Sequence, residues 1–227
     1  MILSRKSHRT GFSLVELLVV ILIISLLLTL GAGIMKNISG GNSLGSAVAT
    51  TEALFDEARA IAVGKGTTAK VLVDIDDPQN EDNYLRRIVV VYQELNPQTG
   101  EPEQDKWAVA SRGLTLPEKI YFSQEFSKKD PDNSGAKLDE FTLSATKPLF
   151  DGKYLEYVFN SEGICTTASK GGVGFVLGSG VRPMGQAPRV TGEAKRDFGG
   201  FVVWRNGRTS LFRDNDQIKI PSQVSEF

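Results

Sequence analysis

Cysteine and histidine are almost absent from this sequence. The 227 residues include one cysteine, Cys165, and one histidine, His8. A single cysteine excludes an intramolecular disulfide and a metal site built from several cysteines. Cys165 stands beside apolar residues, which favours a half-buried and unreactive thiol. Stability must therefore come from a packed core rather than from cross-links.

The chain also lacks an excess of either charge, internal repeats and low-complexity tracts. It has 26 Lys and Arg against 27 Asp and Glu, a formal net charge of −1, so the whole chain is not a typical binder of polyanions. No repeat with a period of about 20–50 residues is visible. The length allows one sizeable domain with an appendage rather than two full domains.

One long apolar run lies near the N-terminus. Residues 17–30 are apolar except for Ser25 and Thr29. As a helix, residues 12–35 would be about 36 Å long, enough to cross a hydrocarbon core of about 30 Å. No later run has this length. The sequence therefore predicts one membrane crossing.

The charges beside this run predict its direction. Arg5, Lys6 and Arg9 precede it, and only Lys36 closely follows it. Positive charge is retained in the cytoplasm, so we expect a cytoplasmic N-terminus and a periplasmic or extracellular remainder. A secretory signal peptide with small residues at 31–33 is the alternative. Against it stands a carboxylate, Glu16, inside the apolar run, where a charge costs about 2.5–3.5 kcal/mol.

The junction at the start of the run carries a specific resemblance. Gly11-Phe12-Ser13-Leu14-Val15-Glu16 resembles the prepilin peptidase site of type IV pilin-like proteins. The resemblance implies cleavage between Gly11 and Phe12, methylation of the new Phe12 amine, and insertion in a bacterial inner membrane. It also implies that Glu16 faces the N-terminal amine of a neighbouring subunit, since a cationic partner keeps a buried carboxylate charged. The implied partners are prepilin peptidase, other pilins or pseudopilins, an inner-membrane assembly platform and membrane lipid.

Cleavage would change what the chain can do chemically. Loss of three bases with the leader would change the net charge from −1 to −4, and loss of His8 would leave no histidine. Catalysis by Ser-His-Asp or Cys-His groups and histidine-ligated zinc are then excluded. We expect no enzyme activity, no cofactor and no metal.

A second helical pattern follows the membrane segment. Residues 36–45 are rich in Gly, Asn and Ser, which predicts fraying or a kink. Beyond them an apolar stripe at steps of three and four residues predicts an amphipathic helix ending near Gly64 and Gly66. The stripe consists of Leu44, Val48, Thr51, Phe55, Ala58 and Ala62.

The rest of the chain has the texture of β-structure. Short β-branched or aromatic runs separated by turn residues predict strands at 71–75, 88–92, 107–110, 120–122, 154–159, 172–177 and 201–205. Asn206-Gly207 predicts a two-residue hairpin turn. The fold class is therefore α+β, with a long N-terminal helix packed on an antiparallel sheet. The expected regions are leader 1–11, transmembrane helix 12–36, amphipathic continuation 37–65 and β-rich head 66–227.

Later phrases resemble the GspH/FimT group of minor pseudopilins. They are an ALxxAR-like phrase at 53–62, Phe159-Asn160-Ser161-Glu162-Gly163 and Trp204-Arg205-Asn206-Gly207-Arg208. Major pilins usually carry a helix-kinking proline where this chain has Gly31-Ala32-Gly33, which favours a minor or pseudopilin subunit. The resemblance implies a structural subunit of a type II secretion pseudopilus or type IV pilus-like filament.

Three surface segments are candidate binding sites. Residues 130–135 begin like a calcium loop but lack its final glutamate, and residues 74–83 contain five carboxylates; a turn and a solvated loop are the simpler interpretations. The third segment, 179–213, interleaves bases with aromatics, which nucleic acid can bind. DNA capture by a minor pilin of an uptake system is thus the alternative function, against charges that only solvate a loop or pair with other subunits. The candidate residues are Arg182, Arg189, Lys195, Arg196, Arg205, Arg208 and Arg213.

Overall fold

The computed structural model describes residues 14–130, 134–145, 147–192, 197–212 and 214–227. Side chains at 16–17 and 23–43 lie outside this description. The chain separates into two compact units, 1–40 and 41–227. From here on, the head means residues 41–227, that is, the predicted β-rich region 66–227 together with the helical residues 41–65, and it is described by itself.

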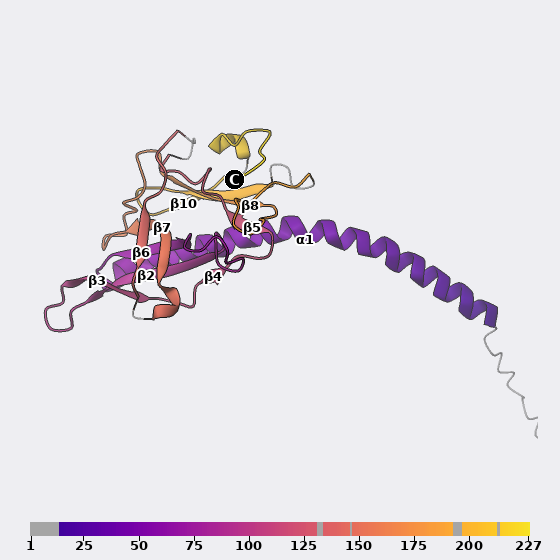
Figure 1. Cartoon of the computed structure of the whole chain (residues 1–227), viewed down its shortest axis with the longest axis horizontal. Helices are drawn as coiled ribbons and strands as arrows, with labels where there is room; N and C mark the ends of the chain where they lie inside the picture. Colours follow the sequence, from indigo (N-terminus) through magenta and orange to yellow (C-terminus); the bar gives the residue numbers. More distant parts are fainter. Residues whose placement is uncertain (1–13, 131–133, 146, 193–196, 213) are drawn as a thin grey trace, which may run out of the picture. The chain divides into compact units, whose positions relative to one another are not determined.

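Helix α1 runs from Leu14 to Lys65 (Figure 1). Its backbone is helical throughout these bounds, so the fraying predicted at 36–45 is not seen, and the kink stays a prediction. Within the residues that the structure describes, no helical stretch combines the length and hydropathy needed for a membrane crossing. The predicted span, 12–36, falls largely on positions whose side chains are outside the description.

The head contains antiparallel β-structure, as the sequence predicts, but divided into two sheets rather than one (Figure 1). Sheet A has the order β3-β2-β1-β7-β6, and β4 pairs with β2. Its strands are β1 (Ala69–Asp74), β2 (Arg87–Leu95), β3 (Pro102–Val109), β4 (Leu114–Thr115), β6 (Glu140–Leu143) and β7 (Gly152–Phe159). Sheet B has the order β10-β9-β8-β5. Its strands are β5 (Ile120–Phe122), β8 (Val173–Ser179), β9 (Phe198–Val203) and β10 (Thr209–Leu211). Short 3-10 helices lie at Pro148–Phe150 (η1) and Asn215–Ile218 (η2).

The core lies between α1 and the two sheets. Every residue of the predicted stripe is at most 6% exposed, which confirms the stripe as the inward face. Phe55 is at its centre and makes edge-on ring contacts at centroid distances of 5.0–6.3 Å. Its partners are Tyr157 and Phe159 of β7, Phe175 of β8 and Phe201 of β9. One side chain of the helix therefore contacts both sheets.

Each sheet has a further apolar cluster on the face turned away from this core. On sheet A, Leu72, Val89 and Tyr154 pack with Phe150 of η1. On sheet B, Val176 and Phe198 pack with the C-terminal residues Ile218, Ile220 and Phe227. Because β1 is covered on both faces, all six of its residues are buried.

The hairpin between β9 and β10 forms as predicted, but the prediction that its turn has two residues was wrong. Trp204 N donates to Arg208 O at 2.8 Å and Gly207 N donates to Trp204 O at 2.8 Å, so the loop is 205–207. A two-residue type I′ turn needs positive φ at both central residues. Here Gly207 has φ of +77°, whereas the Asn206 side chain accepts the Arg208 amide at 3.0 Å. That side-chain bond stabilises the wider turn.

Candidate assembly and interaction sites

The residues predicted for processing and register lie at the edge of what the structure describes. Gly11 and Phe12 lie outside the described residues, and so does the side chain of Glu16. The described neighbours of Glu16 are all apolar and are 46–82% exposed: Leu14, Val15, Leu18, Val19, Val20, Ile21 and Leu22. At 100° per residue these positions surround the whole helix. A helix that is apolar on every side needs an apolar environment, either lipid or other apolar helices.

The three phrases that resemble the GspH/FimT group meet at one place in the head. Arg59 Nε of α1 donates to the carbonyl of Gly163 at 3.3 Å. A Cβ added at Gly207 would lie 2.3 Å from that same carbonyl oxygen and 2.7 Å from Arg59 Nε. Cys165 N also donates to Arg205 O at 3.0 Å. This junction fixes α1 to two turns, one after β7 and one between β9 and β10.

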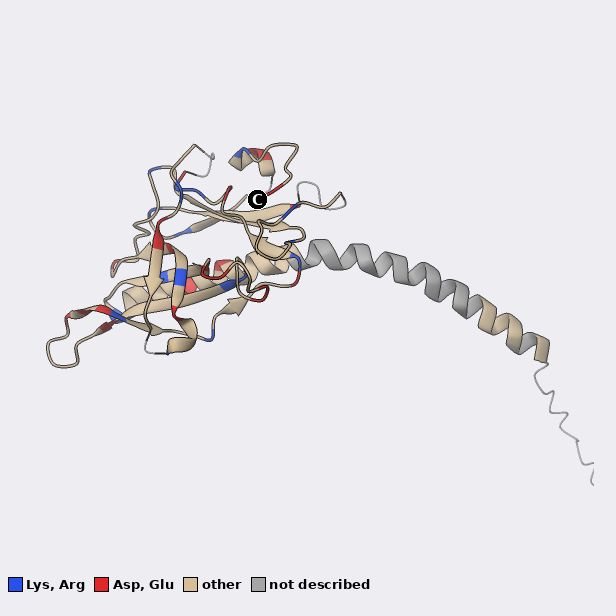
Figure 2. Ribbon diagram, viewed as in Figure 1, with Lys and Arg blue, Asp and Glu red and all other residues tan. Residues whose placement is uncertain are grey.

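The described residues of the basic segment do not form a single surface. Arg182 is only 6% exposed, so it cannot belong to an exposed patch, and this part of the expectation is corrected. Arg189 pairs with Glu226 at 3.2 Å. Arg205 and Arg208 are exposed on the β9–β10 turn. In the view of Figure 2, acidic and basic residues are interspersed over the head. The remaining candidates, Lys195, Arg196 and Arg213, lie outside the described residues.

Arg182 instead holds the acidic loop. Its terminal nitrogens donate to Pro78 O at 2.8 Å and to Asn80 O at 3.2 Å. Its guanidinium lies 5.0 Å from the ring centre of Tyr84, and Gly185 N also donates to Pro78 O. This contact could not be predicted from local sequence, because the partners are backbone carbonyls about a hundred positions away.

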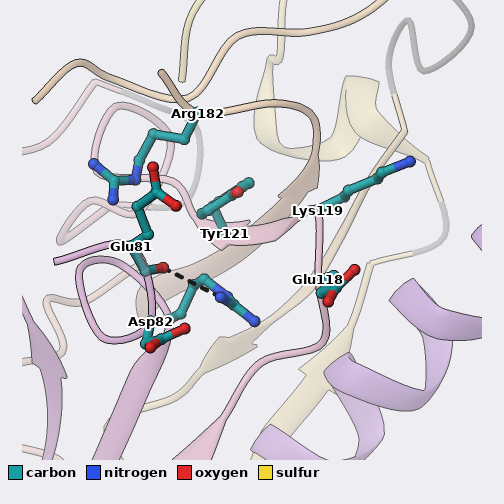
Figure 3. A pocket seen from close by; sticks show the side chains of 7 residues that line it. Glu81, Asp82, Glu118, Lys119, Tyr121 and Arg182 are labelled. Atoms are coloured by element: carbon teal, nitrogen blue, oxygen red, sulfur yellow. Dashed lines mark hydrogen bonds between the residues drawn. The ribbon is translucent and has the colours of Figure 1, made fainter. Parts of the chain in front are cut away.

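A cavity of about 270 Å³ lies beside the contact between Arg182 and the acidic loop (Figure 3). Its lining combines three cations with three carboxylates and one tyrosine: Arg86, Lys119, Arg182, Glu81, Asp82, Glu118 and Tyr121. Arg86 donates to the carbonyl of Glu81 at 3.2 Å, the dashed line in Figure 3. The lining is formally neutral, so it does not favour a polyanion. Within the described ranges, no three His, Cys, Asp or Glu side chains are grouped to hold a metal ion.

A buried charged network crosses sheet A at the end of β1. Arg87 pairs with Asp74 at 2.6 Å and donates to the Tyr154 hydroxyl at 3.0 Å. Burial raises the pKa of Asp74 even though Arg87 opposes the shift, and burial raises the pKa of Tyr154 to about 12. These groups fasten β1, β2 and β7 together. Of the calcium-like segment, residues 131–133 lie outside the described residues.

An apolar groove of about 330 Å³ lies where α1 meets the end of sheet B. Its lining is Leu44, Gly45, Val48, Ala49, Gly199, Gly200, Leu211 and Phe212. Leu211 is 56% exposed, and a Cβ at Gly45 would meet no atom within 4 Å. This part of the helix therefore faces the core on one side and remains accessible on another.

Comparison with known proteins identifies the N-terminal segment. Residues 6–32 match the prokaryotic N-terminal methylation motif, which confirms the predicted resemblance to prepilins. No curated protein matches the chain. Two solved structures of the minor pseudopilin EpsH from the type 2 secretion system of Vibrio cholerae are similar to it at 18% and 19% identity, each with a TM-score of 0.38. They cover 75% and 77% of this chain and 95% of each EpsH chain.

Proposed function

We propose that this chain is a minor pseudopilin, cleaved between Gly11 and Phe12 by a prepilin peptidase and methylated at Phe12. The observation that carries the proposal is the methylation motif at residues 6–32, which includes this junction and Glu16. The bases before the junction favour a cytoplasmic N-terminus in a bacterial inner membrane. The head is then periplasmic or extracellular.

The exposed apolar start of α1 supports insertion and assembly. Leu14 is 82% exposed and Leu22 is 56% exposed, which is costly in water and favourable in lipid or a bundle of apolar helices. Within such a bundle, Glu16 would stay charged only beside a cation. The methylated amine of Phe12 on a neighbouring subunit is that cation, so the pair would set the register between subunits.

The work of the protein is structural. The helix inserts and assembles with other pilin-like subunits on an inner-membrane platform, and the head is displayed outside the membrane. We assign the filament to a type II secretion pseudopilus. The exposed groove beside Leu44 and Leu211 is one surface at the head helix that neighbouring subunits could contact.

Two measurements test this assignment. Mass spectrometry of the mature chain should find methylated Phe12 at the N-terminus, and Gly11→Ala in the leader should block the cleavage. A deletion strain should lose several exported proteins, with their precursors retained in the periplasm, and the intact gene should restore them. An unprocessed N-terminus would refute the prepilin assignment, whereas a processed chain with an unchanged export profile would refute only the secretion role.

DNA capture by a minor type IV pilin is the second candidate function. The β9–β10 turn favours it, because Arg205 and Arg208 are exposed there beside Trp204, which is 40% exposed. Bases beside an aromatic ring can bind phosphates and stack on nucleobases. Under this function, Arg205→Glu with Arg208→Glu should abolish DNA uptake in a strain that still displays the subunit. Unchanged uptake in that strain would contradict it.

A further inference from the structure

A polar groove on sheet A has no part in assembly as proposed. Its volume is about 430 Å³, within the range of small-molecule sites. Lys70 of β1, Gln93 of β2 and Glu156 of β7 contribute to its lining. The groove lies on the face of sheet A that is turned away from α1, beside the apolar cluster around Leu72.

A largely buried ion pair forms part of the lining. Lys70 Nζ lies 2.7 Å from Glu156 Oε2, and the two side chains are 11% and 16% exposed. The ammonium also lies over the rings of Phe141 and Trp107, at 3.6 Å and 4.4 Å from their centres. Replacing such a pair by apolar residues is often neutral or stabilising, so stability alone does not explain it. The bond to Glu156 uses one of the three ammonium donors, and a carboxylate accepts several hydrogen bonds.

The remaining lining offers donors and acceptors without a net charge. Thr68 and Thr167 contribute hydroxyl groups, and Gln93 donates to Glu103 O, which leaves its own amide oxygen as an acceptor. A second ion pair, Lys129 with Asp139 at 2.7 Å, stands at the groove. The two lysines balance the two carboxylates. A polyanion or a polycation would therefore meet like charges here. The hydroxyl groups of a neutral ligand can donate to the carboxylates and to the Gln93 oxygen and accept from the lysines.

The pairing of β1 with both of its neighbours favours a ligand rich in hydroxyl groups over an extended peptide. Extended peptides join a sheet through the free backbone groups of an edge strand. Strand β1, in contrast, is paired with β2 on one side and β7 on the other. A ligand above β1 must bond to side chains, and hydroxyl groups suit these side chains. Trp107 also lines the groove, is 8% exposed and has the Lys70 ammonium 4.4 Å from its ring centre, so its fluorescence can report a change at the ion pair.

We propose that this groove binds a neutral oligosaccharide, held by the Lys70–Glu156 pair, the threonine hydroxyls and Gln93. The site would give the displayed head a glycan ligand in addition to its neighbours in a filament. This proposal does not depend on whether the filament belongs to a secretion system or to a pilus.

The test uses the full chain in micelles of a detergent without a sugar headgroup. The probes are chitotetraose, cellotetraose and maltotetraose. Trp204→Phe leaves Trp107 as the fluorescent reporter, since the chain has two tryptophans. We expect a saturable change in fluorescence with at least one probe. Lys70→Met with Glu156→Met should weaken that binding at least about tenfold, or about 1.4 kcal/mol.

A matched control lies on β3. Lys106 and Glu103 form an ion pair of the same residue types, with Lys106 63% exposed, so Lys106→Met with Glu103→Met should leave the affinity unchanged. Thr68→Val, which removes one hydroxyl at nearly constant shape, supplies a second test should the double variant fail to fold. The proposal is overturned by any of three results: no probe binds, both double variants bind alike with Thr68→Val also unaffected, or an extended peptide binds the groove while the sugars do not.

Discussion

Gly207 approaches Gly163 so closely that a Cβ at 207 would lie 2.3 Å from the Gly163 carbonyl oxygen. That oxygen already accepts a hydrogen bond from Arg59 Nε, so it cannot move away without breaking the bond to α1. Both glycines also have positive φ, +76° at Gly163 and +77° at Gly207. The two turns and the helix are thus fitted to one another by the absence of side chains.

Gly207→Ala should therefore destabilise the head by more than about 1 kcal/mol, since both the φ and the contact are incompatible with alanine. Gly64→Ala is the matched control, because a Cβ there would meet no atom within 4 Å. In a helix, alanine should stabilise by about 0.5–1 kcal/mol relative to glycine. Urea unfolding of the full chain in micelles measures both effects. Equal effects at the two positions would contradict the close approach.

Phe55→Ala should remove about 3–5 kcal/mol from the free energy of unfolding of the head. The ring is 1% exposed and contacts aromatic rings on β7, β8 and β9, so its loss leaves a cavity between α1 and both sheets. Urea unfolding followed by tryptophan fluorescence measures the loss. Val63→Ala, on the same helix at a side chain that is 53% exposed, should cost less than about 1 kcal/mol. A similar cost for both would show that the helix does not depend on its central ring.

Arg182→Leu should destabilise the head by about 1–3 kcal/mol. The Pro78 and Asn80 carbonyls each lose a charged donor and keep only a backbone donor, and the contact with the Tyr84 ring is lost. Arg208→Leu, at an exposed position, should change stability by less than about 0.5 kcal/mol. Limited proteolysis adds a local measurement: in Arg182→Leu, cleavage should appear first in the loop 77–86. If Arg182 were a surface base like Arg208, the two variants would melt alike and this loop would stay protected.

The inward face of the helix could be predicted because its apolar spacing extends over five turns. Strands β1 and β8 could be predicted because each contains a short run of apolar residues that is buried in the sheet. Strands β4 and β6 were missed, since β4 has two residues and β6 has a partly exposed pattern. Pairing with β2 and β7 creates those two strands, and pairing partners are not written in local sequence.

The candidate sites also differ in whether local sequence could predict them. Gly11, Phe12 and Glu16 belong to one short contiguous motif, which a sequence can carry without any knowledge of the fold. Arg182 does not, because its carbonyl partners come from a loop distant in the chain. One signal in the sequence could have indicated the Lys70 ion pair: a lysine stands at the start of the buried strand 69–74. A charge in a run that must be covered on both faces needs a partner, and Glu156 is that partner.

Cys165 should not react with thiol reagents in the native head at neutral pH. The side chain is 0% exposed, rather than half-buried as expected, and burial raises the pKa of the thiol to about 11. Reaction needs the thiolate and access, and both are missing. Labelling by Ellman's reagent should become complete only after urea unfolding, whereas a cysteine introduced by Ser210→Cys at an exposed position should react at once. Rapid native labelling of Cys165 would contradict the structure around the Arg205–Cys165 contact.

Asp197→Asn should stabilise the head at neutral pH and lose this advantage in acid. Burial raises the pKa of Asp197 above its ordinary value of 3.8, although a hydrogen bond with the Ser179 side chain opposes the shift. The folded state therefore binds this proton more tightly than the unfolded state, and its contribution to stability, present below the ordinary value, is lost as pH rises through the folded pKa. Asparagine carries no charge at any pH, so it avoids the cost of burying the carboxylate. Thermal melts of parent and variant across this range should converge as pH falls, while Asp82→Asn, at an exposed position, should change little. A gap between Asp197→Asn and the parent that widens in acid would mean that the carboxylate stabilises the fold instead.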